Sequence, residues 1–239
     1  MPVMEKARAA AARAGTKGVP RRDREEQILA VATEEFGRHG YTGVSMAALA
    51  RRIGVTKPLL YQYFGSKDGL YTTCLARVGE PLATAVRAAM HRPAAEPATP
   101  IAVLRAVFAT LEGRPGAWFL LYDQSLPAGS APYETARRYR DAIDELAAGG
   151  AQDVLRAGNI EDPLDADLLK RLWNTLVGQS VVWWARHPEE SAASMGERCA
   201  RILQAVRFGG PAGGEGERRH DGDERRHDGG ERHRGEGEG

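Results

Sequence analysis

Apolar residues recur at intervals of three and four along most of the stretch from residue 21 to residue 208, which predicts an all-α fold. Glycine and proline clusters divide this pattern into separate elements. The expected helices cover about 23–39, 46–53, 57–64, 66–90, 101–111, 133–155, 164–186 and 189–208, and residues 116–126 are apolar almost all round. Residues 1–20 and 209–239 contain no periodic large apolar side chains, so we expect a disordered basic arm and a disordered low-complexity tail.

The two short helices at 46–53 and 57–64 are joined by a tight turn. The apolar stripe of the first helix consists of Met46, Leu49, Ala50 and Ile53. Ser45 precedes it as a natural N-cap, and Gly54 follows where a helix end often needs a left-handed backbone. Thr56 can cap the second helix, whose first turn tolerates Pro58. Helix, glycine-containing turn and helix together predict a helix-turn-helix.

The second short helix has a polar outer face. Leu60 and Phe64 point to one side, whereas Lys57, Leu59, Gln62 and Tyr63 are left largely outside. Residues 51–67 contain no acidic side chain, and their basic residues are Arg51, Arg52, Lys57 and Lys67. Phosphate contacts supply most of the affinity for DNA, and base edges are read by a helix in the major groove. A solvated basic face on a small helical core is the alternative, but spacing and charge together favour DNA binding.

Charge is unevenly distributed along the 239 residues. The formal net charge of +1 gives no global argument for a nucleic-acid partner. Residues 1–67, however, hold 12 Lys/Arg and six Asp/Glu, whereas residues 68–239 hold 21 and 26. This asymmetry predicts that only the first part meets phosphate. The basic residues of the arm are suited to the DNA backbone or a minor groove, although an inert leader would have the same composition.

Cysteine use and hydropathy favour the cytoplasm. Cys74 and Cys199 lie too far apart in sequence to suggest a disulfide framework or a metal site, and core thiols are a simpler explanation than a redox sensor. No apolar run has the length of about 20 residues that crosses a membrane, and no secretory signal follows the N-terminus. We therefore expect a cytoplasmic protein with no membrane partner.

An ordered set of residues extends over about fifty positions around the helix-turn-helix. Its members are Ile28, Ala32, Phe36, Gly40, Tyr41, Ala50, Gly54, Val55, Leu60, Tyr61, Phe64, Ser66, Lys67 and Leu70. With this set the sequence resembles the TetR-like (TetR/AcrR) family of bacterial transcriptional regulators. Two positions depart from the family pattern: Pro58 replaces a smaller, more flexible residue, and Gly69 stands where an acid often completes a capping box after Ser66.

The resemblance implies a helix-turn-helix DNA-binding domain at 21–66 and a larger helical ligand-binding and dimerisation domain at 67–208. It implies a sequence-specific repressor that an unknown small-molecule effector releases from a double-stranded DNA operator. The helix at 66–90 would then be a mechanical connector between the two domains. The helices at about 164–186 and 189–208 carry more apolar surface than one partner could hide, and members of this family look like homodimers built on these two helices.

Eight residues are the expected DNA contacts. Those assigned to phosphates are Ser45, Thr56, Tyr61 and Lys67, and those assigned to bases are Lys57, Pro58, Leu59 and Gln62. Among the latter, Gln62 is suited to adenine and Lys57 to guanine.

Internal aromatic residues suggest an apolar effector pocket in the larger domain. The candidates are Phe108, Trp118, Phe119, Tyr122, Trp173 and Leu176, with Asp123, Gln124, Asn174 or Gln179 as candidate polar anchors. For any single one of these aromatic residues, ordinary core packing is the better explanation.

Two other functional classes compete with a specific regulator. One is a nonspecific architectural DNA-binding protein that uses the arm as its main contact. The other is a helical enzyme, although the sequence has no phosphate loop, metal-ligand spacing or nucleophile–base set, so we expect no catalytic residue and no cofactor. The tail repeats ERRHDG at Glu217–Gly222 and Glu224–Gly229, and its histidines are weak metal-ligand candidates without a preformed geometry.

Overall fold

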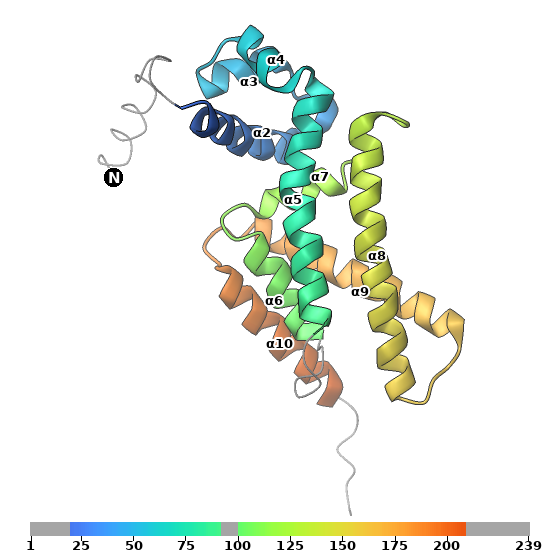
Figure 1. The fold of residues 1–239 in the computed structure, drawn as a ribbon. Helices are drawn as coiled ribbons and strands as arrows, with labels where there is room; N and C mark the ends of the chain where they lie inside the picture. The colour runs from blue at the N-terminus through green and yellow to red at the C-terminus, as the bar shows by residue number, and fades with distance from the viewer. Residues whose placement is uncertain (1–19, 92–99, 209–239) are drawn as a thin grey trace, which may run out of the picture.

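A computed structural model of the chain describes residues 20–91 and 100–208, and within these residues the fold is entirely helical (Figure 1). The elements are α2 (Arg21–Gly43), α3 (Met46–Ile53), α4 (Lys57–Phe64), α5 (Lys67–Met90), α6 (Pro100–Thr110), the 3-10 turn η1 (Pro115–Ala117), α7 (Trp118–Leu121), α8 (Ala131–Ala157), α9 (Pro163–Ala185) and α10 (Ala192–Phe208). The basic arm, apart from Pro20, and the repeat-containing tail lie outside the described residues. None of the described helices combines the length and apolar character that a membrane crossing requires.

Helices α2, α3 and α4 form the helix-turn-helix unit at one end of the molecule (Figure 1). The predicted caps are confirmed: the Ser45 hydroxyl accepts from the Ala48 N–H at 3.1 Å, and the Thr56 hydroxyl accepts from the Leu59 N–H at 3.4 Å. Gly54 adopts the left-handed backbone with φ of 79°. The turn between α3 and α4 therefore has the conformation that its residue types favour.

Gly69 is explained by its surroundings. The Ser66 hydroxyl accepts from the Gly69 N–H at 2.9 Å, so α5 is capped without an acid at this position. A Cβ atom on residue 69 would lie 2.1 Å from the carbonyl oxygen of Phe64. The close approach of α4 and α5 thus excludes the side chain that would complete a capping box.

Helix α2 differs from the expected range of about 23–39. Its helical backbone is broken at Gly40, which has φ of 68°, and one further turn follows to Gly43. Gly37 does not end the helix; it lets the backbone of Gly116 approach, since a Cβ on residue 37 would lie 2.5 Å from the Gly116 carbonyl oxygen. The end of α2 therefore packs directly on η1.

Helix α5 runs down the centre of the molecule, from the helix-turn-helix unit to the far end of the larger domain (Figure 1). It continues through Gly79 and Pro81, two residue types that often interrupt or kink a helix. Gly79 is buried beneath the ring of Tyr139 on α8, and a Cβ there would lie 2.4 Å from that ring. The glycine thus serves close packing between α5 and α8.

One further boundary is corrected. The last helix begins at Ala192 rather than near Glu189, whereas α8 is continuous over the expected range, through Gly149 and Gly150. The Ser191 hydroxyl accepts from the Ser194 N–H at 3.1 Å, which caps α10 at this later point. Glu190, which the sequence suggests for the first turn, instead bonds to the side chains of Ser194 and Arg198.

One apolar core extends from α2 to α10. It joins Ile28 of the helix-turn-helix unit, through buried residues of α5, to Cys199. At the junction, the Phe36 ring lies edge-on to the Tyr71 ring with 4.7 Å between centroids. The helix-turn-helix unit therefore shares its core with the larger domain.

Candidate nucleic-acid interface and internal cavity

Helix α4 presents its polar face to solvent. Leu60 is fully buried and anchors the helix, whereas Lys57, Pro58 and Gln62 are exposed and Leu59 is half-buried. Tyr61 is 40% exposed, with the Lys57 ammonium 5.7 Å from the centre of its ring. The four residues assigned to bases thus share a surface with Tyr61.

The other residues assigned to phosphates flank α4. Ser45 and Thr56 are exposed at the starts of α3 and α4, where helix N-termini favour anions. Lys67 is half-buried at the start of α5, with its ammonium 4.2 Å from the centre of the Tyr41 ring. Burial lowers the pKa of Lys67, an effect that Asp68 and Asp123 oppose.

The positive charge of this surface is smaller than the residue count suggests. Arg52 pairs with Glu35 at 3.1 Å and approaches Glu34 at 3.9 Å, so its charge is partly neutralised. In the described part of the chain, Arg51 and Lys57 form no ion pair and remain available to a phosphate.

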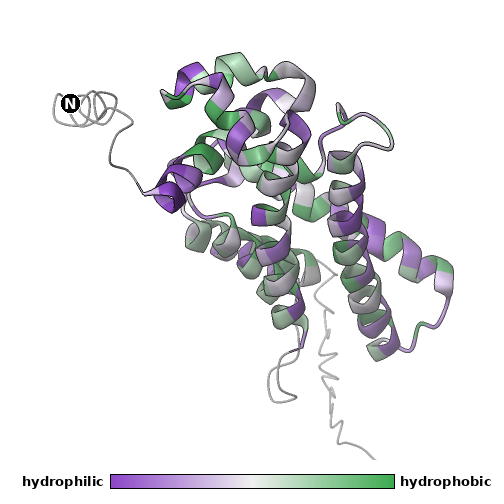
Figure 2. Ribbon diagram, turned by 45° about the horizontal axis from the view of Figure 1, so that its top comes forward, coloured by the Kyte–Doolittle hydropathy of each residue, from purple (hydrophilic) through white to green (hydrophobic). Residues whose placement is uncertain are grey.

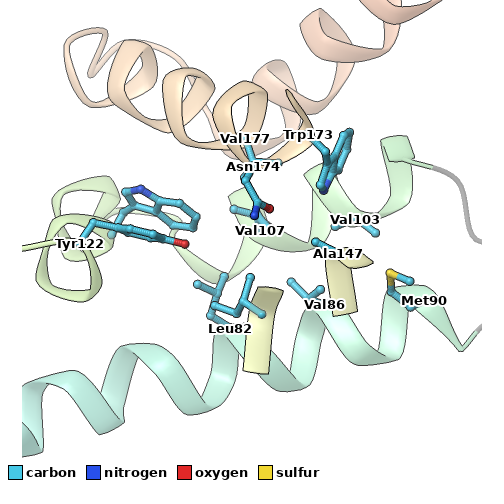
Figure 3. A pocket seen from close by; sticks show the side chains of 12 residues that line it. Leu82, Val86, Met90, Val103, Val107, Tyr122, Ala147, Trp173, Asn174 and Val177 are labelled. Carbon is cyan, nitrogen blue, oxygen red and sulfur yellow. The ribbon is translucent and has the colours of Figure 1, made fainter. Parts of the chain in front are cut away.

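A narrow cavity lies inside the larger domain, between α5, α6, α7, α8 and α9 (Figure 3). The volume inside it that is open to the centre of a water molecule is about 30 Å³, so the lining side chains almost fill the cavity in this conformation. The lining residues are Leu82, Val86, Met90, Val103, Val107, Trp118, Tyr122, Ile143, Ala147, Trp173, Asn174 and Val177. Because only Asn174 and the ends of Tyr122 and the tryptophans are polar, the cavity suits an apolar molecule.

Three of the six expected pocket residues line this cavity. They are Trp118, Tyr122 and Trp173; the first two rings are stacked with 4.7 Å between centroids. Phe108 lies elsewhere in the core, with its ring 5.5 Å from that of Trp184, and Phe119 and Leu176 are half-buried against the core. The sequence shows the apolar stripe of α5 that supplies Leu82, Val86 and Met90, but it gives no sign that this stripe borders empty space.

The candidate polar anchors separate in the structure. Asn174 lines the cavity and donates from Nδ2 to the Asp144 carboxylate at 2.8 Å. Gln124 and Gln179 are exposed, and Asp123 faces the end of α2 instead of the cavity. Only one of the four expected anchors is therefore placed to contact a cavity ligand.

Tyr122 brings a neutral hydroxyl to the cavity. Burial and the nearby Asp144 carboxylate raise the pKa of Tyr122 to about 12. Within the described residues this hydroxyl has no hydrogen-bond partner. Figure 3 shows it and the Asn174 amide pointing into the same space.

The comparisons with known proteins decide the family. Residues 28–74 match the family model described as bacterial regulatory proteins, tetR family. The HTH-type transcriptional regulator Mb1846 of Mycobacterium bovis is 34% identical over 164 residues, which are 63% of this chain and 70% of that protein. This chain belongs to the tetR family. It is accordingly a DNA-binding transcription regulator of the helix-turn-helix type, and its relatives are regulators rather than enzymes.

Two other regulators are similar over a shorter stretch of sequence or in their fold alone. The transcriptional activator FasR of Mycolicibacterium smegmatis is 42% identical over 73 residues, but the match covers only 30% of this chain and 33% of that protein. The structure of the transcriptional regulator FadR from Bacillus subtilis in complex with stearoyl-CoA superposes with a TM-score of 0.56 and 15% identity. It covers 76% of this chain and 96% of that chain, which shows a shared fold.

Proposed function

We propose that this tetR-family regulator is a sequence-specific repressor that binds its operator as a homodimer and leaves it when a small molecule occupies the cavity. The observation that carries the proposal is the exposed polar face of α4, held outward by the buried Leu60. A short helix presented in this way can enter the major groove of double-stranded DNA.

The residues of this surface divide by chemistry into two groups. Ser45, Thr56, Tyr61 and Lys67 contact phosphates and fix the orientation of the helix-turn-helix unit. Lys57, Pro58, Leu59 and Gln62 face base edges. Gln62 offers an amide that pairs with adenine, and Lys57 offers an ammonium that suits the acceptor atoms of guanine.

Exposed apolar side chains on α9 and α10 support the homodimer. Leu164, Leu168 and Leu172 recur every fourth residue along α9 and are 77%, 55% and 60% exposed, and Ile202 and Val206 on α10 are 61% and 74% exposed. Figure 2 shows hydrophobic residues alternating with hydrophilic ones along the end of α9 that extends past α8. A second copy would bury these side chains and set two helix-turn-helix units on adjacent half-sites.

The chemistry of the cavity supports a neutral, mostly apolar effector. Among the residues that the structure describes, no Lys or Arg lines the cavity, and the Asp144 carboxylate lies beside Asn174, so these residues offer an anionic group no partner. The Tyr122 hydroxyl and the Asn174 amide suit one hydroxyl or carbonyl group on the ligand. The effector releases DNA only if it binds the DNA-free conformation more tightly than the operator-bound one. We further propose that the protein acts in the cytoplasm without a cofactor.

Comparing affinities for one selected operator and for random duplex at fixed salt tests this proposal. A specific regulator prefers its operator by about a thousandfold or more. Neutral apolar alcohols and ketones titrated into the operator complex should then release the DNA, and Asn174→Ala should raise the concentration needed. Equal affinity for both duplexes would favour the architectural alternative, and release only by carboxylates would contradict the assignment of the cavity.

A further inference from the structure

The turn that follows α7 holds the end of α2 through hydrogen bonds. The Tyr41 N–H donates to Asp123 Oδ2 at 2.6 Å, and the Thr42 N–H donates to the Ser125 hydroxyl at 3.3 Å. The Ser125 N–H in turn donates to Asp123 Oδ1 at 2.8 Å, which fixes the carboxylate within its own turn. Two consecutive backbone groups of the helix-turn-helix unit are thus bonded to side chains of the larger domain.

The same carboxylate also binds the connector helix. The buried Tyr71 of α5 donates its hydroxyl to Asp123 Oδ2 at 2.9 Å, and this hydroxyl lies 3.2 Å from the Leu120 carbonyl oxygen. Burial alone would raise the pKa of Asp123, but hydrogen bonds from Ser125, Tyr41 and Tyr71 together lower it. The carboxylate is therefore ionised at neutral pH, and hydrogen bonds to an ionised acceptor are the stronger kind. We call Asp123 with Tyr41, Tyr71 and Ser125 the Asp123 clamp.

Gly40 is required where the clamp meets α2. Its φ of 68° lies in the left-handed region, and a Cβ there would lie 3.0 Å from the Ser125 hydroxyl oxygen and 3.2 Å from Asp123 Oδ1. The break in α2 therefore brings the Tyr41 N–H within reach of the carboxylate. The left-handed backbone of Gly40 and the carboxylate of Asp123 are therefore both needed for this hydrogen bond.

The clamp adjoins the cavity through one peptide bond. Tyr122 precedes Asp123, and its ring lines the cavity in a stack with Trp118. Arg140 of α8 donates to the Leu121 carbonyl oxygen at 2.6 Å and holds the end of α7 in place. The Tyr122 side chain that forms part of the cavity wall is therefore only one residue away from the Asp123 carboxylate.

A second polar contact between the helix-turn-helix unit and α5 is weaker. Arg77 pairs with Glu26, but these side chains are 33% and 51% exposed, and exposed ion pairs contribute little. The Asp123 clamp is buried further and joins three elements at one carboxylate. It is thus a stronger polar restraint on the orientation of the unit than the Arg77–Glu26 pair, and the Tyr41 hydroxyl adds a further link by donating to Asp68 of α5.

We propose that Asp123 is the positioning residue that couples occupancy of the cavity to the orientation of the helix-turn-helix unit. While the clamp is closed, the helix-turn-helix units of the two protomers are held at a fixed separation. This separation matches one spacing between the half-sites of the operator. Displacement of Tyr122 opens the clamp and frees the end of α2. This inference rests on the proposed function, since it needs a dimer, an operator and a ligand cavity.

The first test compares the affinity of each variant for the selected operator with its affinity for the same duplex carrying two extra base pairs between half-sites. Asp123→Asn should lower this ratio by about fivefold or more, the size of a typical coupling between sites, and Tyr71→Phe should lower it in the same direction. Affinity for random duplex should not change. Glu112→Gln is the matched control, because Glu112 also accepts a backbone N–H across elements, from Ala192 at 3.1 Å, but this contact ties the end of α6 to the start of α10 and does not involve α2.

A second test uses a filled cavity in place of the unidentified effector. Val107→Phe adds bulk to the cavity wall and should speed hydrogen exchange of the Tyr41 and Thr42 amides in an otherwise wild-type chain. Asp123→Asn alone should speed the same amides, and adding Val107→Phe to it should cause no further change. Additive effects of the two substitutions would show that the cavity does not act through Asp123.

The outcomes separate the two claims. If the wild-type protein does not discriminate between the two spacings, the dimeric operator-binding function is wrong and the clamp inference falls with it. If the wild type discriminates and Asp123→Asn discriminates equally, only the clamp inference is overturned. A uniform loss of folded protein lowers the affinity for both spacings equally and leaves their ratio unchanged. Thermal unfolding of each variant then shows separately whether the whole fold is destabilised.

Discussion

Leu60 and Gln62 lie two positions apart on α4 and have opposite environments: Leu60 is fully buried and Gln62 is exposed. The helical period turns the two side chains away from each other, so one anchors the helix and the other is free to meet a base. Substitutions at exposed positions of α4 should therefore change DNA recognition without changing stability.

Gln62→Ala should relax base preference at one position of the half-site. The loss of a paired amide contact to adenine corresponds to about 1–3 kcal/mol of discrimination at that base pair. Affinities measured for the operator and its single-base variants check this result. An unchanged preference at every position would remove Gln62 from base recognition.

Lys67→Ala should weaken binding to all duplexes by a similar factor. Because a phosphate contact carries no sequence information, the affinity should depend less steeply on salt, by about one unit of slope. Titrations of operator and random duplex at several salt concentrations measure this slope. A selective loss for the operator alone would place Lys67 near a base instead.

The Asp123 carboxylate predicts an acid-sensitive part of the stability. Its pKa is lower in the folded chain than the ordinary value of 3.8, so the stabilisation is present above that value and is lost as pH falls through the folded-state pKa. The difference in urea midpoint between wild type and Asp123→Asn should thus be constant from pH 8 to pH 5 and shrink below about pH 4. A difference that persists undiminished in acid would contradict the ionised clamp.

At the scale of whole elements, α5 depends on a glycine for its contact with α8. Alanine normally stabilises a helix interior by about 0.5–1 kcal/mol relative to glycine. At Gly79, however, the added methyl group would lie 2.4 Å from the Tyr139 ring, so overpacking should outweigh that gain and destabilise the fold by about 1–3 kcal/mol.

Gly149→Ala is the matched control for Gly79→Ala. Gly149 also lies inside a long helix, and a Cβ there would meet nothing within 4 Å. Its substitution should raise the free energy of unfolding by a fraction of a kilocalorie to about 1 kcal/mol. Urea denaturation of the two variants compares them directly, and equal effects would contradict the close packing at Gly79.

Most of the helices follow from the sequence because their signals are local. Caps such as Ser45, Thr56 and Asp162 satisfy backbone groups of the next turn, so residue type alone places the helix starts. The missed boundaries depend on distant contacts. Glycine is a residue type that disfavours a helix interior, but Gly37 and Gly79 are each needed for the close approach of another element, η1 or α8. The start of α10 differs from the expected position near Glu189 because Ser191 provides the cap and the Glu190 side chain bonds to Arg198, eight residues along the chain.

The candidate sites also differ in how far local sequence signals predict them. The buried and exposed faces of α4 could be predicted because one short amphipathic helix contains both the anchor Leu60 and the exposed side chains. The cavity could be assigned only in part, since five elements enclose it and the sequence does not show which faces of those elements oppose one another. The Asp123 clamp joins residues 82 positions apart and has no sequence signal at all.

At the scale of the whole molecule, the proposed dimer makes the exposed stripe of α9 essential for tight binding. Leu168→Asp combined with Leu172→Asp should produce a folded monomer, because both side chains are more than half exposed in the single chain. Operator affinity should fall by about two orders of magnitude or more as the two half-sites lose their linkage. Analytical ultracentrifugation and operator titration measure the two effects.

Val154→Asp provides the control for this double substitution. Val154 is 51% exposed on α8, outside the stripe of α9, so the variant should remain dimeric and keep its operator affinity. A double variant that still sediments as a dimer, or a Val154 variant that dissociates, would place the interface elsewhere.

Selection of bound duplexes from a random pool tests the central claim most directly. The wild-type protein should enrich one sequence with two related half-sites in inverted orientation, because a twofold dimer presents two identical α4 helices. The same selection with Gln62→Ala should lose preference at one position in each half-site. A pool that stays random at low salt, with the protein folded, would contradict the account.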